Sequence, residues 1–224
     1  MILALTAIFS YLLGSIPFGL LLTKIAGLGD IRTVGSGNIG ATNVLRTGNK
    51  KLAALTLLLD MAKGFAAVFI ASLIAYKYLA CYAISCTAGS IACDCTHEHM
   101  MFVMTCGIIC ILGHLFPVWL KFKGGKGVAT GIGVLLGAFP MAGISAIAVW
   151  LIMAFSFRIS SLAALTAFLA APLVTFIVYN SSAALLVLSV SILVWWRHKE
   201  NILRLIKGQE SKISFRKPDA PTNP

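Results

Sequence analysis

Long apolar runs alternate with short polar segments along this chain. An apolar run of about 20 residues is long enough to cross the hydrocarbon core of a bilayer as a helix. The stretch from Gly127 to Phe157 is too long for one span, and Pro140 near its middle should divide it. Seven candidate spans result, at Leu3–Leu22, Leu52–Tyr76, Met101–Leu120, Gly127–Phe139, Met141–Phe157, Ser161–Tyr179 and Ser182–Trp196.

The composition agrees with this pattern. The 224 residues are 59% hydrophobic and 11% charged, whereas a soluble domain is about half apolar and a quarter charged. We therefore predict an all-α polytopic membrane protein with about seven transmembrane helices. No linker divides it, so residues 1–206 should form a single membrane domain and residues 207–224 a polar, solvated cytoplasmic tail.

The net charge of +11 is concentrated in the gaps between the apolar runs. Five Lys and Arg residues lie between Lys24 and Lys51, three between Lys121 and Lys126, and seven from Arg197 onward. Basic clusters near span ends mark the cytoplasmic side. Seven spans with the N-terminus outside place these clusters and the C-terminus on that side. The charge therefore indicates topology first, and no nucleic acid partner is expected.

All six cysteines lie between Cys81 and Cys110. Cys93, Cys95, His97, Glu98 and His99 are metal-ligand residue types, but their spacing matches no standard zinc pattern. An external loop or an additional partial helix is the favoured interpretation, and no metal site is expected. A disulfide stays open as an alternative if the segment faces an oxidising compartment.

The first polar motif lies in the gap between the first two spans. Glycines there allow successive backbone N–H groups to converge on an anion, and an arginine adds a charged fork suited to phosphate. The GxGxxG match is not a dinucleotide site, because a membrane helix and not a strand precedes it. A phosphate-binding loop is favoured over a flexible turn, with candidate residues Gly35, Ser36, Gly37, Asn38, Thr42, Asn43 and Arg46.

The second motif, Phe122–Thr130, begins a helix on the same side of the membrane. Backbone amides at a helix N-terminus next to lysines make a good phosphate site. The alternative is that the lysines are only positive-inside topology signals, which fits Lys121 best. Glycines flank Lys126, and glycine is unfavourable in a helix. Their presence at this helix start therefore favours a binding role over a topology signal alone. The candidates for substrate binding here are Lys123, Gly124, Gly125, Lys126 and Gly127.

The third motif is Trp195-Trp196-Arg197-His198-Lys199-Glu200-Asn201. A helical conformation places His198 and Asn201 one turn apart on one face, where His198 could be a base or a phosphate ligand. The alternative is an interfacial aromatic belt with solvated charges, and the two tryptophans fit that description.

Smaller features have structural interpretations. Asp60 and Lys63 should form an intramembrane ion pair, and His114 should be a hydrogen-bonded core residue. Gly133 and Gly137 have GxxxG spacing, which permits close helix contact. Ser160 and Ser161 could cap a helix or contact a substrate hydroxyl.

Together these segments resemble the bacterial acyl-phosphate:glycerol-3-phosphate acyltransferases over nearly the whole chain. The chain departs from that family in an insertion at residues 77–100, which should be external. The resemblance rests on Gly14–Pro17, Gly35–Asn43 with Arg46, Asp60-x-x-Lys63-Gly64, Gly113-His114-x-Phe116-Pro117, Phe122–Thr130, Ser160-Ser161-Leu162 and Arg197–Asn201.

The resemblance implies transfer of a fatty acyl group from acyl phosphate to the 1-hydroxyl of glycerol 3-phosphate, without a cofactor, metal or acyl-CoA. It also implies a bacterial inner-membrane protein in contact with membrane lipid, with its active site on the cytoplasmic face. Glycines 124, 125 and 127 would shape the glycerol-phosphate loop, and Ser160 or Ser161 would supply a substrate contact. The leading catalytic candidates are Ser36, Arg46, Lys126, Ser161, His198 and Asn201.

An acyl phosphate is already activated, so we expect direct attack by the glycerol hydroxyl. Lys126 and Arg46 would neutralise phosphate charge, and the phosphate would accept the proton. The HxxxxD dyad of other lipid acyltransferases is missing, and no cysteine lies in the basic loops.

Two other function classes compete with this interpretation. A transporter or exchanger of organic phosphates would share the spans and basic loops, but its polar groups should lie near the bilayer midplane. A non-catalytic assembly subunit would tolerate alanine at Ser36, Arg46 and Lys126.

Overall fold

The computed structural model describes residues 1–85 and 95–213, and every regular element in these ranges is helical. The expected all-α class is therefore confirmed. Two short 3-10 helices lie in loops, η1 (Ile31–Thr33) and η2 (Val118–Leu120). The α-helices are α1 (Ile2–Gly14), α2 (Phe18–Ile25), α3 (Ala41–Leu45), α4 (Lys50–Ser85), α5 (Cys95–Leu115), α6 (Val128–Ala138), α7 (Pro140–Phe157), α8 (Ser160–Val178), α9 (Ser181–Arg197) and α10 (Lys199–Ile206).

Most of the cysteine-rich insertion lies outside the description, which omits the side chains of residues 79–96. The metal and disulfide interpretations of Cys93 and Cys95 therefore remain predictions. The described ends of the insertion are helical and not a loop, because α4 extends to Ser85 and α5 begins at Cys95. Cys106 and Cys110 are described, and both are buried free thiols on α5.

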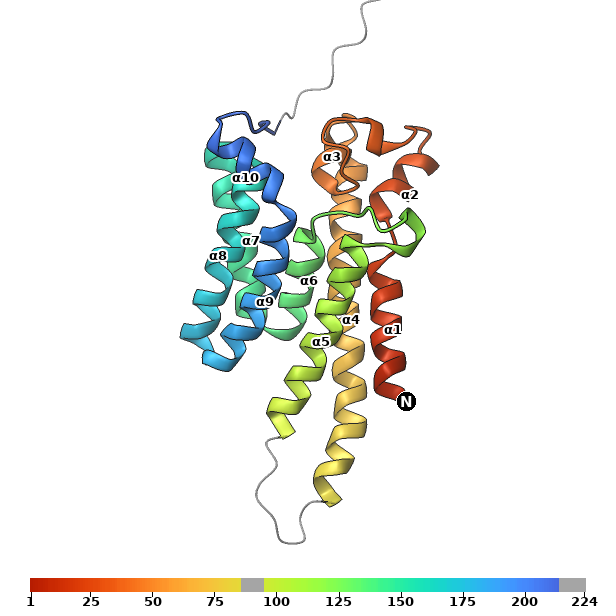
Figure 1. Ribbon diagram of the computed structural model, residues 1–224, viewed down its shortest axis with the longest axis vertical. Coiled ribbons are helices and arrows are strands. Elements are labelled where there is room, and N and C mark those ends of the chain that lie inside the picture. The colour runs from red at the N-terminus through yellow and green to blue at the C-terminus, as the bar shows by residue number, and fades with distance from the viewer. Residues whose placement is uncertain (86–94, 214–224) are drawn as a thin grey trace, which may run out of the picture.

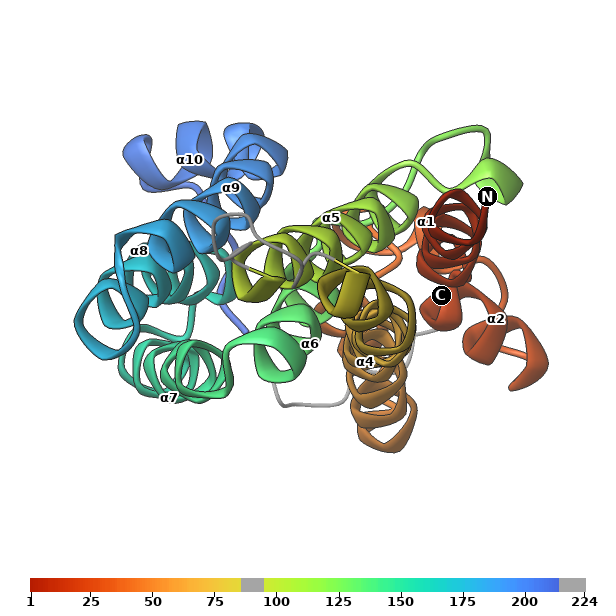
Figure 2. The same ribbon diagram turned by 90° about the horizontal axis from the view of Figure 1, so that it is seen from below.

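The helices form a bundle of two groups (Figure 1). Helices α1, α4 and α5 pack against one another on one side, and α7, α8 and α9 pack together on the other. The short helix α6 lies between the groups, in contact with α4, α5, α7 and α9. The end-on view in Figure 2 shows the same arrangement, with α6 between α4 and α7. Helix α6 therefore connects the two halves of the bundle.

All seven segments expected to span the membrane are helical, but they are not equally long. Four helices (α4, α5, α7 and α8) are long and apolar enough to cross a bilayer, and the bent pairs α1–α2 and α9–α10 raise the number to six. Helix α6 has 11 residues, or about 16 Å at 1.5 Å per residue, against an apolar core of about 30 Å. A count of seven complete spans stays a prediction.

Proline positions account for two of the helix boundaries. Pro140 is the first residue of α7, where its missing N–H is tolerated, so the expected division of the long apolar stretch is confirmed. Pro17 precedes α2 and interrupts the expected span Leu3–Leu22, leaving α1 and α2 bent by 42°. An uninterrupted helix is disfavoured there because Pro17 cannot donate the hydrogen bond that would continue α1.

Small residues pack the interior and large apolar ones cover the outside. A Cβ atom on Gly133 would lie 2.0 Å from the carbonyl oxygen of Met61, and one on Gly137 would lie 2.3 Å from Cγ2 of Val68. The expected close helix contact is therefore confirmed, between α6 and α4. Large side chains such as Phe155 and Ile177 are 75% and 80% exposed, which fits a surface that faces lipid.

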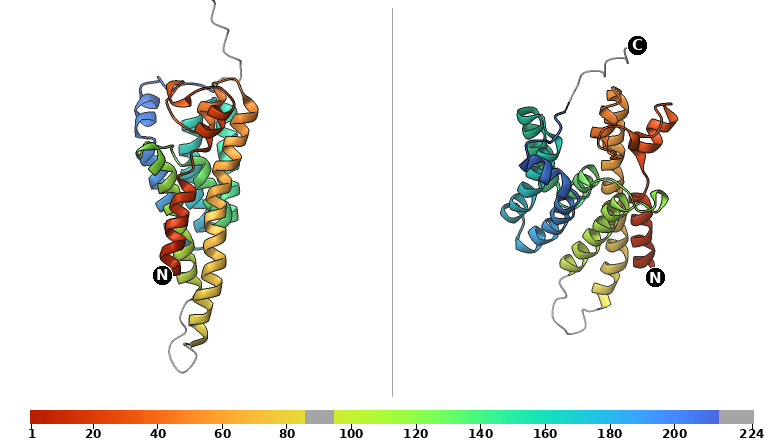
Figure 3. Two further views of the ribbon diagram at one scale, coloured as in Figure 1. Left: turned by 90° about the vertical axis from the view of Figure 1, so that its right-hand side faces the viewer. Right: turned by 45° about the horizontal axis from the view of Figure 1, so that its top comes forward.

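The connections that carry most of the basic residues gather at one end of the bundle (Figures 1 and 3). The loop before α4, the loop before α6 and helix α10 lie toward this end, and the N-terminus of α1 lies toward the other. The sequence expectation that these clusters share one face agrees with this arrangement.

Candidate active site

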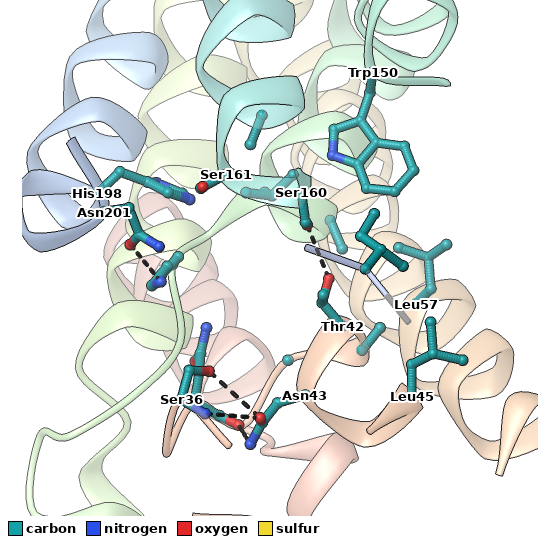
Figure 4. Close-up of a pocket in the computed structure, with 18 of the residues that line it drawn as sticks. Ser36, Thr42, Asn43, Leu45, Leu57, Trp150, Ser160, Ser161, His198 and Asn201 are labelled. Atoms are coloured by element: carbon teal, nitrogen blue, oxygen red, sulfur yellow. Dashed lines mark hydrogen bonds between the residues drawn. The ribbon is translucent and has the colours of Figure 1, made fainter. Parts of the chain in front are cut away.

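A cavity of about 670 Å³ opens at the end of the bundle where the polar loops gather. Its walls come from the α3 region, the loop leading into α6, the start of α8, and the α9–α10 junction with the residues that follow it, together with parts of α4, α5 and α7. Figure 4 shows side chains from these separate elements surrounding one space.

The first polar loop is folded around the buried side chain of Asn43. The amide nitrogen of Asn43 donates hydrogen bonds to the carbonyl oxygens of Ile31, Val34 and Asn38 over 2.8–2.9 Å. Its Oδ1 atom accepts a hydrogen bond of 3.1 Å from the backbone N–H of Ser36. Asn43 therefore organises the loop through its own amide, and Ser36 is left exposed beside the cavity.

Thr42 and Arg46 extend this wall toward other elements. The hydroxyl oxygens of Thr42 and Ser160 lie 3.0 Å apart, which joins α3 to the start of α8 (Figure 4). Arg46 Nη2 donates a hydrogen bond of 2.5 Å to the hydroxyl of Ser211. Gly35 has a φ of 54°, and a Cβ atom there would lie 2.5 Å from Arg46 Nη1. Glycine at this position therefore leaves room for the guanidinium.

The second basic loop is held in place through its glycines. Gly124 and Gly125 donate backbone hydrogen bonds of 3.0 Å to the carbonyl oxygens of Leu115 and His114. Arg197 donates hydrogen bonds from Nε and Nη2 to the Gly125 carbonyl, both over 3.2 Å. Gly127 has a φ of 82°, which favours glycine, and it leads directly into α6.

This loop places Lys126 beside the N-terminus of α6, where unpaired backbone N–H groups and the helix dipole favour an anion. Burial lowers the pKa of Lys126 to about 8, and the nearby Glu210 carboxylate partly opposes that shift. Lys126 Nζ donates a hydrogen bond of 2.5 Å to Asn201 Oδ1. The second and third motifs therefore meet at this lysine.

Glu210 completes a polar network with the third motif. Its Oε1 atom accepts hydrogen bonds from the side chains of Asn201 over 2.6 Å and Ser161 over 2.8 Å. Arg204 Nε donates to its Oε2 atom over 2.7 Å. Burial raises the pKa of Glu210, but these three hydrogen bonds outweigh burial and keep the pKa below its usual value.

His198 lies buried at the junction of α9 and α10. Its Nδ1 atom is 2.8 Å from the carbonyl oxygen of Val194, and a carbonyl oxygen can only accept a hydrogen bond. The ring proton therefore sits on Nδ1, and Nε2 carries a lone pair. Burial lowers the pKa of His198 to about 4, so the ring is neutral at neutral pH. Because His198 lines the cavity, the site holds an uncharged proton acceptor.

One part of the cavity wall is apolar. In Figure 4, Leu45, Leu57 and Trp150 are grouped apart from His198 and Asn201. A cavity with a basic part and an apolar part suits an amphiphile with an anionic head. The apolar lining consists mainly of Leu45, Leu57, Met61, Ile147, Trp150 and Leu151.

The structure brings together all the residues expected to be catalytic. Lys123 lies exposed outside the cavity lining, as does Gly37, and Gly124 and Gly125 shape the loop without lining the cavity. Ser160 and Ser161 both line it, and only Ser161 joins the Glu210 network. The expected residues that line the cavity are Gly35, Ser36, Asn38, Thr42, Asn43, Arg46, Lys126, Gly127, Ser160, Ser161, His198 and Asn201.

Sequence reasoning missed the residues just after α10. Residues 209–213 line the cavity, although they belong to a segment expected to be a solvated tail. The backbone N–H of Ile213 donates a hydrogen bond of 2.6 Å to the Arg158 carbonyl, and Ile213 packs against Ala154 and Ala163. An isolated isoleucine in a polar segment was the available signal.

Comparisons with known proteins agree with this site. The family described as glycerol-3-phosphate acyltransferase matches residues 4–208. The glycerol-3-phosphate acyltransferase of Agrobacterium fabrum is 53% identical over 212 residues, which cover 95% of this chain and 92% of that protein. The protein of the same description from Caulobacter vibrioides is 52% identical over 217 residues, covering 96% and 90%.

Two crystal structures of PlsY (YgiH), described as an integral membrane glycerol 3-phosphate acyltransferase, are also similar. The glycerol 3-phosphate form has a TM-score of 0.78 and 37% identity, over 96% of both chains. The lysophosphatidic acid form has a TM-score of 0.76 and 36% identity, over 96% of this chain and 97% of that one. The chain is therefore an integral membrane protein that belongs to the glycerol-3-phosphate acyltransferase family.

Proposed function

We propose that this protein transfers a fatty acyl group from an acyl phosphate to the 1-hydroxyl of sn-glycerol 3-phosphate. The products are lysophosphatidic acid and phosphate, and the reaction is the first step of phospholipid synthesis. The observation that carries this proposal is one cavity in which the basic groups Arg46 and Lys126 share a space with apolar side chains such as Trp150. Both substrates bear a phosphate, and one of them bears a fatty chain.

The transfer needs little chemistry from the protein, because the donor is a mixed anhydride. The glycerol hydroxyl oxygen forms a bond to the acyl carbon, and the bond from that carbon to the phosphate oxygen breaks. The phosphate leaves with the electron pair and takes the hydroxyl proton. Lys126 and Arg46 stabilise the phosphate charge, and Ser36, Ser161 and Asn201 add neutral hydrogen bonds. No cofactor is required for this step.

The membrane topology follows from the same charges. The end of the bundle that carries the basic loops is proposed to face the cytoplasm of a bacterial inner membrane, because Lys and Arg are enriched on that side. The apolar part of the cavity, which includes Leu57 on α4 and Leu151 on α7, would then accept the fatty chain from the bilayer.

A transporter of organic phosphates is the alternative. Its substrate site would lie near the middle of the membrane, whereas the cavity opens at one end of the bundle beside the polar loops. Proteoliposomes given labelled glycerol 3-phosphate and palmitoyl phosphate separate the two functions. We expect labelled lysophosphatidic acid with no accumulation of water-soluble label inside. Uptake of glycerol 3-phosphate without any lipid product would overturn the proposal.

A further inference from the structure

A buried polar cluster lies beneath the second basic loop and has no part in the proposed reaction so far. It consists of Asp60 and Lys63 on α4 and His114 near the end of α5, all at most 5% exposed. Lys63 Nζ lies 2.7 Å from Asp60 Oδ1, 2.9 Å from the Ile16 carbonyl oxygen and 2.9 Å from His114 Nδ1. An ammonium group has N–H donors and no acceptor, so Lys63 donates hydrogen bonds to Ile16 and His114 and forms an ion pair with Asp60.

This arrangement fixes the tautomer of His114. Because Lys63 can only donate, His114 Nδ1 must accept, and the proton of the neutral ring sits on Nε2. Asp60 Oδ1 lies 3.7 Å from Nδ1, which is too far for a hydrogen bond. The carboxylate therefore acts on His114 through Lys63, by holding its charged ammonium group in place.

The Nε2–H group has no hydrogen-bond partner in the described part of the chain. It lies against the second basic loop, where a Cβ atom on Gly125 would come within 2.1 Å of Nε2. Glycine at position 125 thus leaves room for the imidazole. His114 is also part of the cavity wall, with Lys126, Gly127 and Val128. An unpaired N–H donor in the wall of a cavity can pair with an acceptor on a bound molecule.

The acceptor that fits this part of the wall is an anion. Helix α6 begins at Val128, so its first backbone N–H groups lack partners within the helix. Gly125, which contacts the His114 ring, directly precedes Lys126 in the same loop. The imidazole N–H, the lysine ammonium and the start of α6 therefore provide donors from three sources along one side of the cavity.

We propose that His114 is a further substrate-binding residue, whose Nε2–H donates to a phosphoryl oxygen held between Lys126 and the start of α6. Lys63 and Asp60 are positioning residues that keep the donor on the cavity side of the ring. The inference rests on the proposed function, because it assigns the donor to one of that reaction's two phosphate groups. The group belongs to glycerol 3-phosphate or to the acyl phosphate, and kinetics with each substrate varied separately distinguish these.

The test compares His114→Leu, which removes the donor and fills the space, with His114→Gln, whose amide can donate from a similar position. His99→Leu is the matched control, because it makes the same substitution on α5 about 22 Å away along the helix. We expect His114→Leu to raise the KM for one phosphate substrate at least 10-fold. His114→Gln should recover to within about 3-fold of the parent, and His99→Leu should match the parent. Equal KM values for the parent and His114→Leu would overturn the proposal, as would equal losses in both His114 variants when these are folded.

A second measurement decides the matter if the His114 variants do not fold, and it does not depend on turnover. The chain has four histidines, so ¹⁵N-labelled His114 can be assigned by elimination against variants of the other three. We expect the Nε2–H tautomer, and a shift of that resonance when glycerol 3-phosphate or palmitoyl phosphate is added. An Nδ1–H tautomer, or no response to either compound, would overturn the proposal. Absence of product from the folded parent in the transfer assay would instead refute the proposed function.

Discussion

Lys126 Nζ and Asn201 Oδ1 lie 2.5 Å apart, although 75 positions separate them in the chain. The contact joins the loop before α6 to helix α10, and Asn201 Nδ2 in turn donates a hydrogen bond to Glu210. Lys126 is thus held toward one side of the cavity while its ammonium keeps other donors for a phosphate. The positions of the two motifs depend on each other, and this dependence leads to the first prediction.

Replacing Asn201 with alanine should lower kcat/KM for glycerol 3-phosphate about 100-fold, the scale of losing one preorganised donor. The change removes the partner of Lys126 and one of the three donors to Glu210. Asn180→Ala is the matched control, since Asn180 only caps α9 through the N–H of Ala183. Transfer rates with labelled substrate would check this, and equal rates for the two variants would contradict the account.

The rate should fall as the pH rises through about 8. Lys126 stabilises phosphate only as an ammonium ion, and burial lowers its pKa to about 8. Because kcat/KM reports the free enzyme, that parameter should decline between about pH 8 and 9, well above the second phosphate pKa of about 6.

Two variants test whether the titration of Lys126 causes this decline in kcat/KM. The Glu210 carboxylate raises the pKa of Lys126, so Glu210→Gln should move the decline to lower pH. Lys121→Met, which removes an exposed lysine from the same loop, should leave the midpoint in place. A midpoint unaffected by Glu210→Gln would show that another group controls the decline.

Glu210 should also stabilise the fold. Its side chain is 7% exposed and accepts hydrogen bonds from Ser161, Asn201 and Arg204. Hydrogen bonds to a charged group contribute about 1.5–3 kcal/mol, so Glu210→Ala should lower the melting temperature measurably. Glu200→Ala, at an exposed position in the first turn of α10, should not.

The stabilisation by Glu210 depends on pH in a defined direction. Because the pKa of Glu210 is lowered in the folded protein, its contribution is present above the unfolded pKa of about 4.3. It is lost as the pH falls through the folded value. The difference in melting temperature between the parent and Glu210→Ala should therefore shrink below about pH 4. A difference that grows on acidification would be inconsistent with these hydrogen bonds.

His198→Gln should retain substantial turnover. The proton of the glycerol hydroxyl is proposed to leave on the phosphate, so no protein base is needed for the step. If the phosphate does not take this proton, the lone pair on His198 Nε2 is the best placed acceptor in the protein. The substitution therefore distinguishes the two proton acceptors. A rate at background level from a folded His198→Gln variant would identify His198 as the base.

The apolar pattern predicted much of this structure. The seven runs are all helical, Pro140 divides the long one, and the glycines of α6 meet α4 as their spacing predicted. These features depend on local sequence and on the bilayer. The break at Pro17 was not predicted, because the apolar residues on both sides continue through it.

The motifs predicted which side chains surround the cavity, but they did not predict which of these side chains hydrogen-bond to one another. Asn43 and Ser36 are similar polar types in one loop, yet Asn43 is used inside the loop and Ser36 faces the cavity. The place of Glu210 could not be read from its surroundings in sequence, because its partners Ser161 and Asn201 come from other parts of the chain. Such pairings arise only from the tertiary arrangement.

The measurement that tests the central claim most directly uses purified, folded protein and labelled glycerol 3-phosphate. Palmitoyl phosphate and palmitoyl-CoA are offered as acyl donors in parallel reactions. The account predicts labelled lysophosphatidic acid from palmitoyl phosphate alone, with one phosphate released for each acyl group transferred. Product from palmitoyl-CoA alone, or no product from either donor, would contradict it.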